Sequence, residues 1–262
     1  MDSNTLKNSV SHNDVIISQF TKQTIPFSQM SQHSNHYGLE LMFELSDPQI
    51  DDRVLDVACG PGIIACEFAR KVFHVTGIDI TPAMIEEAKN LQRERKIDNV
   101  DWKLGDVTKL PFEDGSYSLV VTRYSFHHLI NQKQVLEEMQ RVCKPNGKIL
   151  IIDVTPDKDK VGAYNYVEKL RDSSHTGALT FDQLKGLMQQ TGLTNLKSKH
   201  HELEMELESI LKSSFPNPTD LPRIRQLFQK DILMDNLGMK SHLNNGKIFF
   251  YFPISMLLGI KS

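Results

Sequence analysis

Two glycines have the spacing of a loop that cradles a phosphate or a nucleoside. Gly60 and Gly62 lie in VLDVACGPG, between an apolar run that predicts a buried strand and the helical pattern IIACEFARKV. Glycine permits a tight turn and lets a ligand approach the backbone, and the N–H groups at the following helix start favour an anion. Gly60, Gly62 and Ala65 also satisfy the dinucleotide pattern G-x-G-x-x-G/A, so this motif alone fits more than one ligand.

Three acids lie where predicted strands end. Asp56 interrupts an apolar run just before the glycines, which suggests a role at the site or the pinning of the turn through backbone N–H groups. Asp79 closes HVTGID, where a carboxylate can accept both hydroxyls of a ribose or cap the next helix, and Ile80 would offer adenine an apolar face. Asp106 ends a third strand and can accept from an exocyclic amine, while the N–H of Val107 can donate to an adenine ring nitrogen.

Histidine and arginine residues lie at or just after the end of the predicted fourth strand, YSLVVTRY, and in the later loop RDSSHTGALT. An imidazole of His127 or His128 could deprotonate a phenol, a hydroxyl or an activated carbon, or pack into the pocket wall. We favour His128 as the base. Arg123 could contact the cofactor, or it could only hold the loop or pair with an acid. Arg171 and His175, in RDSSHTGALT, could bind a polar or acidic acceptor or order the loop.

No set of His, Cys, Asp and Glu has the spacing of a metal site, so we expect no metal. The three cysteines, Cys59, Cys66 and Cys143, cannot build a disulfide framework. Cys59 lies inside the glycine loop, where we interpret it as a small packed side chain.

The elements that position these residues alternate between strand and helix. RVLDV, HVTGIDI, VDWKLGD, YSLVVTRY and ILIIDV predict strands, and KPNGK predicts a turn. Thr81 followed by Pro82 predicts a hydroxyl-capped helix start, and Asn131 can cap the helix that carries Val135 and Val142. Such alternation implies a parallel sheet covered on both faces.

The flanking regions are less regular. Residues 13–45 predict two helical pieces split near Pro26. After residue 155 we expect a helix at 162–171, a capping box of Thr180 and Gln183, a strand at LKSKHHELEM, helices over 206–237, and a last strand at 247–259. We therefore divide the chain into an N-terminal helical lid, 1–45, and an α/β domain, 46–262, with an insertion at about 206–240.

Four stretches together carry a family resemblance over roughly residues 50–155: VLDVACGPG, GIDITPAMIEEAK, GDVTKLPFEDGSYSLVVTRYSFHHL and EMQRVCKPNGKILIID. In this order they resemble class I S-adenosylmethionine-dependent methyltransferases, most closely the UbiE-like, type 11 group that acts on small molecules. The resemblance implies a Rossmann-like α/β fold with a mostly parallel seven-stranded sheet. It also implies S-adenosylmethionine as cofactor.

The resemblance assigns parts of the cofactor to residues. Gly60 and Gly62 would face the methionine part, Asp79 the ribose, and Asp106 with Val107 the adenine. The segment TRYSFHH would line the sulfonium and the acceptor. The remaining expected cofactor contacts are Asp56, Ala58, Cys59, Ile80 and Arg123.

Aromatic residues suggest the kind of acceptor. Phe20 and Phe27 flank Pro26 in a segment that closes over the cofactor in similar enzymes, although an aromatic stripe packed in the core is equally consistent. With Tyr124 and Tyr164 nearby, we expect a partly aromatic pocket and a flat or lipophilic small-molecule acceptor. Whether oxygen, carbon or nitrogen receives the methyl group stays open.

Two other functions compete with methyl transfer. One is a protein of the same fold that binds S-adenosylmethionine or S-adenosylhomocysteine without transferring a methyl group. The other is a NAD(P)-dependent oxidoreductase, against which stand Asp56 inside the first strand, the Gly-Asp pair after the third, and the lack of a Tyr-x-x-x-Lys pair.

Composition limits the partners. The formal net charge is -3 with no long basic run, so we expect no nucleic-acid partner. The polar N-terminus does not look like a signal peptide, and the apolar stretch Ile248–Ile260 is shorter than the roughly 20 residues that cross a bilayer and contains Pro253. We expect a cytoplasmic monomer or homodimer.

Overall fold

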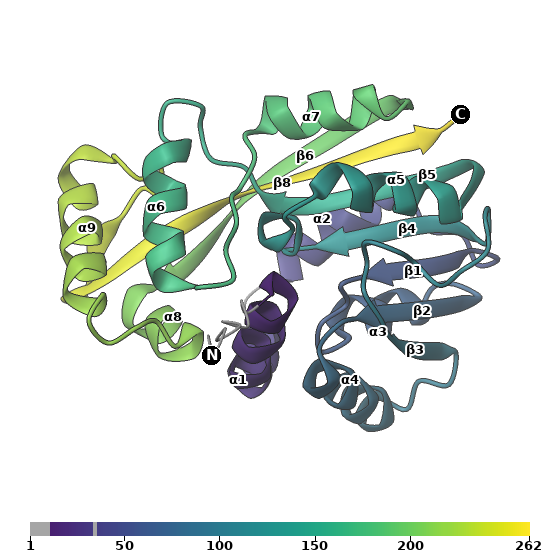
Figure 1. Cartoon of the computed structure of the whole chain (residues 1–262), viewed down its shortest axis with the longest axis horizontal. Helices are drawn as coiled ribbons and strands as arrows, with labels where there is room; N and C mark the ends of the chain where they lie inside the picture. Colours follow the sequence, from purple (N-terminus) through teal and green to yellow (C-terminus); the bar gives the residue numbers. More distant parts are fainter. Residues whose placement is uncertain (1–10, 34–35) are drawn as a thin grey trace, which may run out of the picture.

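Strands alternate with helices through the first half of the chain, as the sequence predicts (Figure 1). The computed structural model describes residues 11–33 and 36–262, with side chains for 11–26 and 36–262. The strands are β1 (Arg53–Val57), β2 (His74–Asp79), β3 (Val100–Leu104), β4 (Tyr117–Arg123), β5 (Cys143–Val154), β6 (Leu193–Glu206), β7 (His242–Asn244) and β8 (Lys247–Lys261). The helices are α1 (His12–His33), α2 (His36–Ser46), α3 (Ile63–Ala69), α4 (Pro82–Arg95), α5 (Gln132–Val142), α6 (Val161–Arg171), α7 (Phe181–Gln190), α8 (Leu207–Ser214) and α9 (Leu221–Met234), with a 3-10 turn η1 (Phe126–His128).

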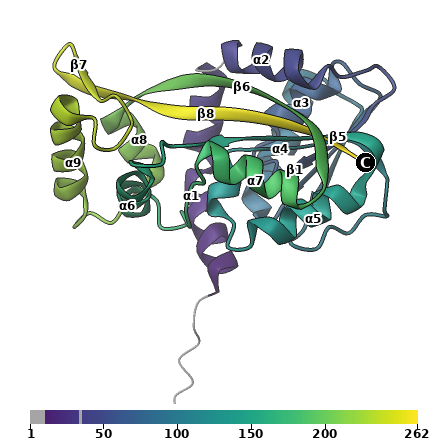
Figure 2. The ribbon, with the colours of Figure 1, turned by 90° about the horizontal axis from the view of Figure 1, so that it is seen from above.

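The strands form one sheet in the order β3-β2-β1-β4-β5-β8-β6, and β7 pairs with β8. Strands β1 to β5 are parallel to one another, whereas β8 lies between β5 and β6 and is antiparallel to both. The predicted mostly parallel α/β sheet is confirmed, and the short β7 adds one strand that we did not predict. Helices cover both faces (Figure 2): one apolar cluster contains side chains of α2 and α3, and the other contains side chains of α5 and α7.

The helical N-terminus differs from the prediction at Pro26. This residue lies inside α1, which continues to His33, so the predicted split near Pro26 is wrong. Proline removes one helical hydrogen bond, but tertiary contacts hold the turns before it. The side chain of Gln19 donates to the carbonyl of Ser214 at 2.5 Å, and that of Gln23 donates to Oδ2 of Asp172 at 2.9 Å.

The helical insertion lies between β6 and β7, where the sequence places it. It consists of α8 and α9, and α9 packs against α6 at the end of the long β6–β8 pair (Figure 1). Both strands are longer than predicted: β6 has 14 residues and β8 has 15. The division into a lid, 1–45, and a domain, 46–262, remains our proposal. None of the helices within the described ranges combines the length and apolar character that crossing a bilayer requires.

The structure confirms some of the predicted helix caps and turns and contradicts others. The cap by Asn131, which accepts from the N–H of Gln134, and the capping box of Thr180 are confirmed. The predicted turn KPNGK is instead part of β5, where Asn146 has a φ of +61° and the register against β4 shifts. Thr81 stands at the N-cap of α4, but its hydroxyl makes no capping hydrogen bond, so that prediction is wrong in its detail.

Candidate active site

The carboxyl ends of β1, β2, β3 and β4 meet at one edge of the sheet, beside α1 (Figure 1). Because these strands are parallel, the loops that follow them converge there. A cavity of about 280 Å³ lies at this edge, and we call it the first cavity. Its lining comes from those loops, from the segment after β4 and from α1, including His12, Asn13 and Phe20.

The glycine loop after β1 forms one wall. Gly60 has a φ of +52°, and a Cβ built there would meet no atom within 4 Å, so its backbone is open to the first cavity that it lines. Gly62 has a φ of +79°, but its Cβ would lie 2.5 Å from Cη2 of Trp102. Gly62 does not line the cavity. The packing of Trp102, rather than a ligand, explains the second glycine.

Asp79 closes β2 with its carboxylate fixed by the backbone. Oδ2 accepts the N–H of Gly60 at 2.9 Å, and Oδ1 accepts the N–H of Thr81 at 2.8 Å. Burial raises the pKa of Asp79, and the hydrogen bonds from Thr81 and Gly60 oppose that rise. Neither bond reaches an N–H of the first turn of α4, so Asp79 pins the glycine loop rather than capping that helix, and it also lines the first cavity.

Asp56 is a buried acid with one oxygen unpaired. It is 2% exposed, and its Oδ2 has no hydrogen-bond partner among the described residues. Burial raises its pKa to about 7, while the charge of Arg123 and the N–H of Ala65 pull it down. Both Asp56 and Arg123 line the first cavity, where such a group favours a cationic ligand.

Asp106 follows β3 and carries bonds from two elements. Oδ1 accepts the N–H and the hydroxyl of Thr108, both at 2.8 Å, and Oδ2 accepts from Nδ2 of Asn13 at 2.8 Å. These hydrogen bonds lower the pKa of Asp106 against the opposing effect of burial. The contact with Asn13 connects α1 to the sheet edge.

The structure brings most of the expected cofactor residues to this one cavity. Of the ten, Gly62 alone stays outside the lining. The nine that line it are Asp56, Ala58, Cys59, Gly60, Asp79, Ile80, Asp106, Val107 and Arg123.

A second cavity, of about 130 Å³, adjoins the first. Its walls come from α6, α8 and the far ends of β6 and β8, and it contains both apolar and charged side chains. Four residues line both cavities: Phe20, Arg123, Tyr124 and His128. The apolar part of the second cavity consists of Val154, Leu203, Met205, Ile210, Phe252 and Ile254, together with the shared Phe20.

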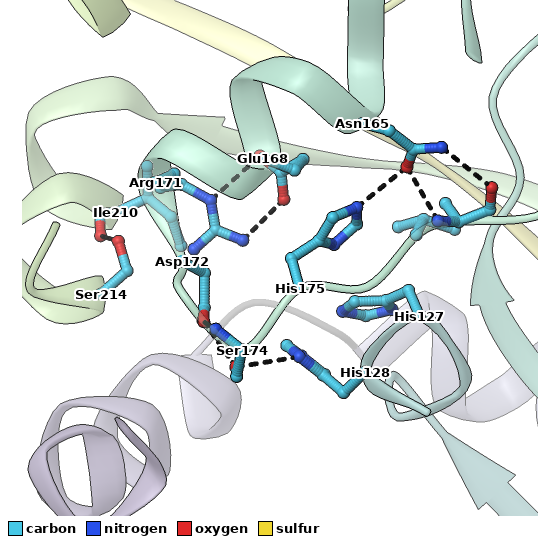
Figure 3. Close-up of polar contacts among 12 residues, drawn as sticks. His127, His128, Asn165, Glu168, Arg171, Asp172, Ser174, His175, Ile210 and Ser214 are labelled. Carbon is cyan, nitrogen blue, oxygen red and sulfur yellow. Dashed lines mark hydrogen bonds and ion pairs between the residues drawn. The ribbon is translucent and has the colours of Figure 1, made fainter. Parts of the chain in front are cut away.

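Three histidines cluster beside the second cavity (Figure 3). His127 and His128 have ring centroids 4.2 Å apart, and His175 lies 5.4 Å from His127. Nδ1 of His127 is 2.6 Å from Oδ1 of Asp153. Burial alone would lower the pKa of His127, but the charge and hydrogen bond of Asp153 raise it. Burial and the neighbouring His127 lower the pKa of His128 to about 3.

The residues expected to bind substrate separate into different places. Phe20 and Tyr124 line both cavities, and Arg171 lines the second, where it forms a buried ion pair with Glu168 at 2.6 Å. His175 lines neither cavity and bonds through Nε2 to Asn165 (Figure 3). The side chain of Phe27 lies outside the described residues.

The sequence did not predict several of the residues that line the two cavities. Asn13 and Gln23 lie on α1, and Glu168 and Asp172 lie in or next to α6. A buried acid such as Glu168 has no distinguishing pattern in the sequence, because its burial depends on tertiary packing. The Asp-Ser-Ser-His run at 172–175 was the available signal, and we used only its histidine.

Metal and thiol chemistry find no support in the described ranges. No three His, Cys, Asp or Glu side chains there are placed to hold a metal ion. The cysteines are free and buried, and burial raises the pKa of the Cys59 thiol well above its usual range. This agrees with the interpretation of Cys59 as a packed side chain.

Known proteins share both the sequence and the fold. The sequence profile of the family described as "Methyltransferase domain" matches residues 49–213. The uncharacterized methyltransferase YcgJ of Bacillus subtilis (strain 168) is 27% identical over 249 residues, which cover 92% of this chain and 97% of YcgJ. The crystal structure of YcgJ aligns with a TM-score of 0.79 at 25% identity over 87% of this chain and 99% of that one.

Two further proteins are similar over different extents. The ubiquinone/menaquinone biosynthesis C-methyltransferase UbiE of Ruegeria sp. (strain TM1040) is 29% identical over 136 residues, 51% of this chain and 54% of UbiE. Phosphoethanolamine N-methyltransferase 2 of Haemonchus contortus, solved in complex with S-adenosyl-L-methionine, shares the fold with a TM-score of 0.68 at 18% identity, covering 97% of this chain and 61% of that one.

These matches confirm the UbiE-like resemblance and favour methyl transfer over the oxidoreductase alternative. The family profile spans well over half of the chain. The chain belongs to the methyltransferase domain family and is an S-adenosylmethionine-dependent methyltransferase.

Proposed function

We propose that S-adenosylmethionine binds in the first cavity, that a small-molecule acceptor binds in the second, and that the methyl group passes between them at their shared wall. The observation that carries this proposal is the pair of adjoining cavities with four residues in common, Phe20, Arg123, Tyr124 and His128. A direct transfer needs two ligands to meet end to end, and alignment of this kind is worth about 7–11 kcal/mol of barrier.

The first cavity fits the chemistry of the cofactor. Gly60 offers open backbone, and the unpaired Oδ2 of Asp56 is a buried acceptor that suits the ammonium of the methionine part. In this proposal Asp79 receives the ribose hydroxyls, and Asp106 with Val107 receives the adenine. The complex of the Haemonchus contortus enzyme with S-adenosyl-L-methionine supports the same ligand on this fold.

S-adenosylmethionine supplies an electrophilic methyl group on a sulfonium whose leaving group is a neutral thioether. The protein's part is to exclude water and align the acceptor. Phe20 closes the boundary from α1, with its ring edge against His128 at a centroid distance of 4.9 Å. Arg123 lies over the ring of Tyr124, 4.6 Å from its centroid, and completes the wall.

The second cavity fits a small acceptor with an apolar body. Leu203, Met205 and Phe252 contribute to its apolar wall, while Glu168 and Arg171 supply polar groups at one side. An aromatic or lipophilic molecule with one polar nucleophilic end matches this division. We propose such a molecule as the methyl acceptor.

His128 is the proposed base. It lines both cavities, whereas His127 lines only the second and is bonded to Asp153. An imidazole at the boundary can reach a proton on an acceptor in the second cavity. His127, which the sequence also suggested, then serves as a wall of the acceptor cavity.

Titration and transfer assays test the proposal together. We expect S-adenosylmethionine to bind in calorimetry, and labelled methyl groups to appear on members of a panel of phenols, quinols and amines. His128→Ala should lower turnover and leave cofactor affinity within about twofold, because acid–base groups act on the chemical step. His36→Ala, at a side chain 91% exposed, is the control.

The outcomes discriminate between the competing functions. Tight binding of the cofactor with no transfer to any panel member would favour a binding protein of the same fold. Failure to bind the cofactor would remove the proposal altogether.

A further inference from the structure

A chain of hydrogen bonds runs from a buried acid to the ring of His128 (Figure 3). Nδ1 of His128 lies 3.0 Å from Oγ of Ser174, and that hydroxyl donates to Oδ1 of Asp172 at 2.5 Å. The N–H of Ser174 also donates to Oδ1 of Asp172, at 2.9 Å. All three residues are buried. We call Asp172, Ser174 and His128 the relay.

The direction of these bonds fixes the tautomer of His128. The single hydroxyl proton of Ser174 goes to the carboxylate of Asp172, which only accepts when ionised. Oγ of Ser174 must then accept from the ring, so Nδ1 of His128 carries the proton. The lone pair is left on Nε2, and this nitrogen has no hydrogen-bond partner within the described part of the chain.

The acid at the other end of the relay is held by the N-terminal helix. Nε2 of Gln23 donates to Oδ2 of Asp172 at 2.9 Å, and Gln23 is itself buried. Phe20, three residues earlier on α1, lies against the ring of His128. The docking of α1 therefore completes both the relay and the wall between the cavities.

The charges around His128 leave it neutral. His127, from η1, carries the raised pKa because of Asp153 on β5, and its charge joins burial in lowering the pKa of His128 to about 3. Asp172 opposes that effect. From the other packed elements, Arg171 and Glu168 of α6 neutralise one another in their ion pair, and the pKa of His175 is lowered by burial. The ring is therefore unprotonated, and it has the free lone pair that a general base needs.

We propose that Asp172, Ser174 and Gln23 are positioning residues that present Nε2 of His128 as a base to the acceptor, which is accordingly a nucleophile that must lose a proton, such as a phenol or another acidic hydroxyl. This inference rests on the proposed function. It goes further by choosing among acceptor classes, because a nucleophile without a proton to lose would need no relay.

The proposed step balances. The bond between the acceptor oxygen and the methyl carbon forms as the bond from that carbon to sulfur breaks, and its electron pair goes to sulfur. The hydroxyl proton goes to Nε2 of His128. In the resulting imidazolium, the path through Nδ1–H and Ser174 to the carboxylate of Asp172 offsets part of the cost that burial and His127 impose on the charge, and the proton passes to solvent after the product leaves.

The tautomer can be measured without any acceptor. In protein labelled with ¹⁵N at histidine, we expect the ring-nitrogen shifts of wild-type His128 to show a protonated Nδ1 and an unprotonated Nε2. Ser174→Ala should change that pattern toward Nε2–H or a mixture, and Ser173→Ala, at the exposed neighbouring serine, should not. An Nε2–H ring in the wild type would overturn the proposal, and so would a pattern that Ser174→Ala leaves unchanged.

Turnover with phenols as methyl acceptors is the second test of the relay. We expect Ser174→Ala and Asp172→Asn to lower kcat at least about tenfold with the KM for S-adenosylmethionine within about twofold, since a misplaced tautomer acts on chemistry. Gln23→Ala should lower kcat less, and Gln23→Glu should not restore it, because a second carboxylate cannot donate to Asp172. Unchanged kcat in Ser174→Ala, or transfer confined to tertiary amines and thioethers, would overturn the proposal.

The two proposals fail in different ways. If wild-type protein does not bind S-adenosylmethionine in calorimetry, the proposed function fails. If it binds the cofactor and transfers methyl groups while His128 keeps its tautomer without Ser174, only the relay fails. Thermal unfolding of Asp172→Asn checks that this variant folds. If the buried amide prevents folding, Ser174→Ala provides the test instead.

Discussion

Nδ2 of Asn13 donates to Oδ2 of Asp106 at 2.8 Å, which joins α1 to the tip of β3 beside the first cavity. Nε2 of His12 also lies 2.8 Å from the carbonyl oxygen of His128, so α1 spans from one side of that cavity to the other. Both residues line it. If the cofactor binds in that cavity as we propose, we expect these contacts of α1 to slow its release.

Loss of the Asn13 contact should speed the release of the cofactor. We expect Asn13→Ala to increase the dissociation rate of S-adenosylmethionine several-fold, since one hydrogen bond to a charged group contributes about 1.5–3 kcal/mol at most. A chase experiment with excess unlabelled cofactor measures this rate. Asn236→Ala, at an exposed asparagine beyond α9, is the control, and equal rates in the two variants would show that the contact does not retain the cofactor.

Asp79 should determine cofactor affinity. We expect Asp79→Ala to weaken S-adenosylmethionine binding by about 1.5–3 kcal/mol, the scale of hydrogen bonds to a charged group. Because the same carboxylate holds the N–H groups of Gly60 and Thr81, part of that loss comes from a looser glycine loop. Calorimetry measures the affinity, with Asp98→Ala at the exposed loop before β3 as the control. Unchanged affinity would remove Asp79 from the site.

Asp56 should make the ligand-free protein less stable as pH rises. Its pKa in the folded protein is about 7, above the value of 3.8 in an unfolded chain, so the folded state holds the proton more tightly. The free energy of unfolding should therefore fall between about pH 4 and pH 7, by up to about 4 kcal/mol from this group alone. Asp56→Asn should remove that fall and be more stable than wild type at pH 8.

Urea unfolding at pH 4.5, 6 and 8 measures the Asp56 effect. The difference between wild type and Asp56→Asn should grow with pH and shrink when saturating S-adenosylmethionine is added, because a bound ammonium would stabilise the carboxylate. Parallel stability curves for the two proteins would contradict the raised pKa.

The sequence alone was enough to predict the sheet and most of the first cavity, and the reason is geometric. Residues at the carboxyl ends of neighbouring parallel strands lie at the same edge of the sheet. The pairing of the strands is therefore enough to bring together Asp56, Gly60, Asp79 and Asp106. The distinction between the two glycines could not be predicted. It depends on Trp102, which lies about 40 residues later in the sequence and fills the space beside Gly62.

The second cavity could not be predicted because its walls come from remote segments. Gln23, Tyr164, Leu203 and Phe252 meet there only after β8 has paired between β5 and β6. A helix boundary was misplaced for a similar reason. Gln19 and Gln23 contact residues 195 and 149 positions away, and these contacts stabilise α1 before Pro26. Helix propensity reflects local sequence only and cannot predict them.

A bulky side chain in the second cavity should block the acceptor without affecting the cofactor. Ile210 on α8 lines the second cavity and not the first, so Ile210→Trp should fill acceptor space and lower methyl transfer at least about tenfold, the scale on which pockets discriminate by steric fit. Affinity for S-adenosylmethionine should stay within about twofold. Leu243→Trp, at a side chain 61% exposed on β7, controls for the added indole. Transfer that continues unchanged in Ile210→Trp, with the cofactor bound normally, would place the acceptor somewhere other than the cavity between α6, α8 and the ends of β6 and β8.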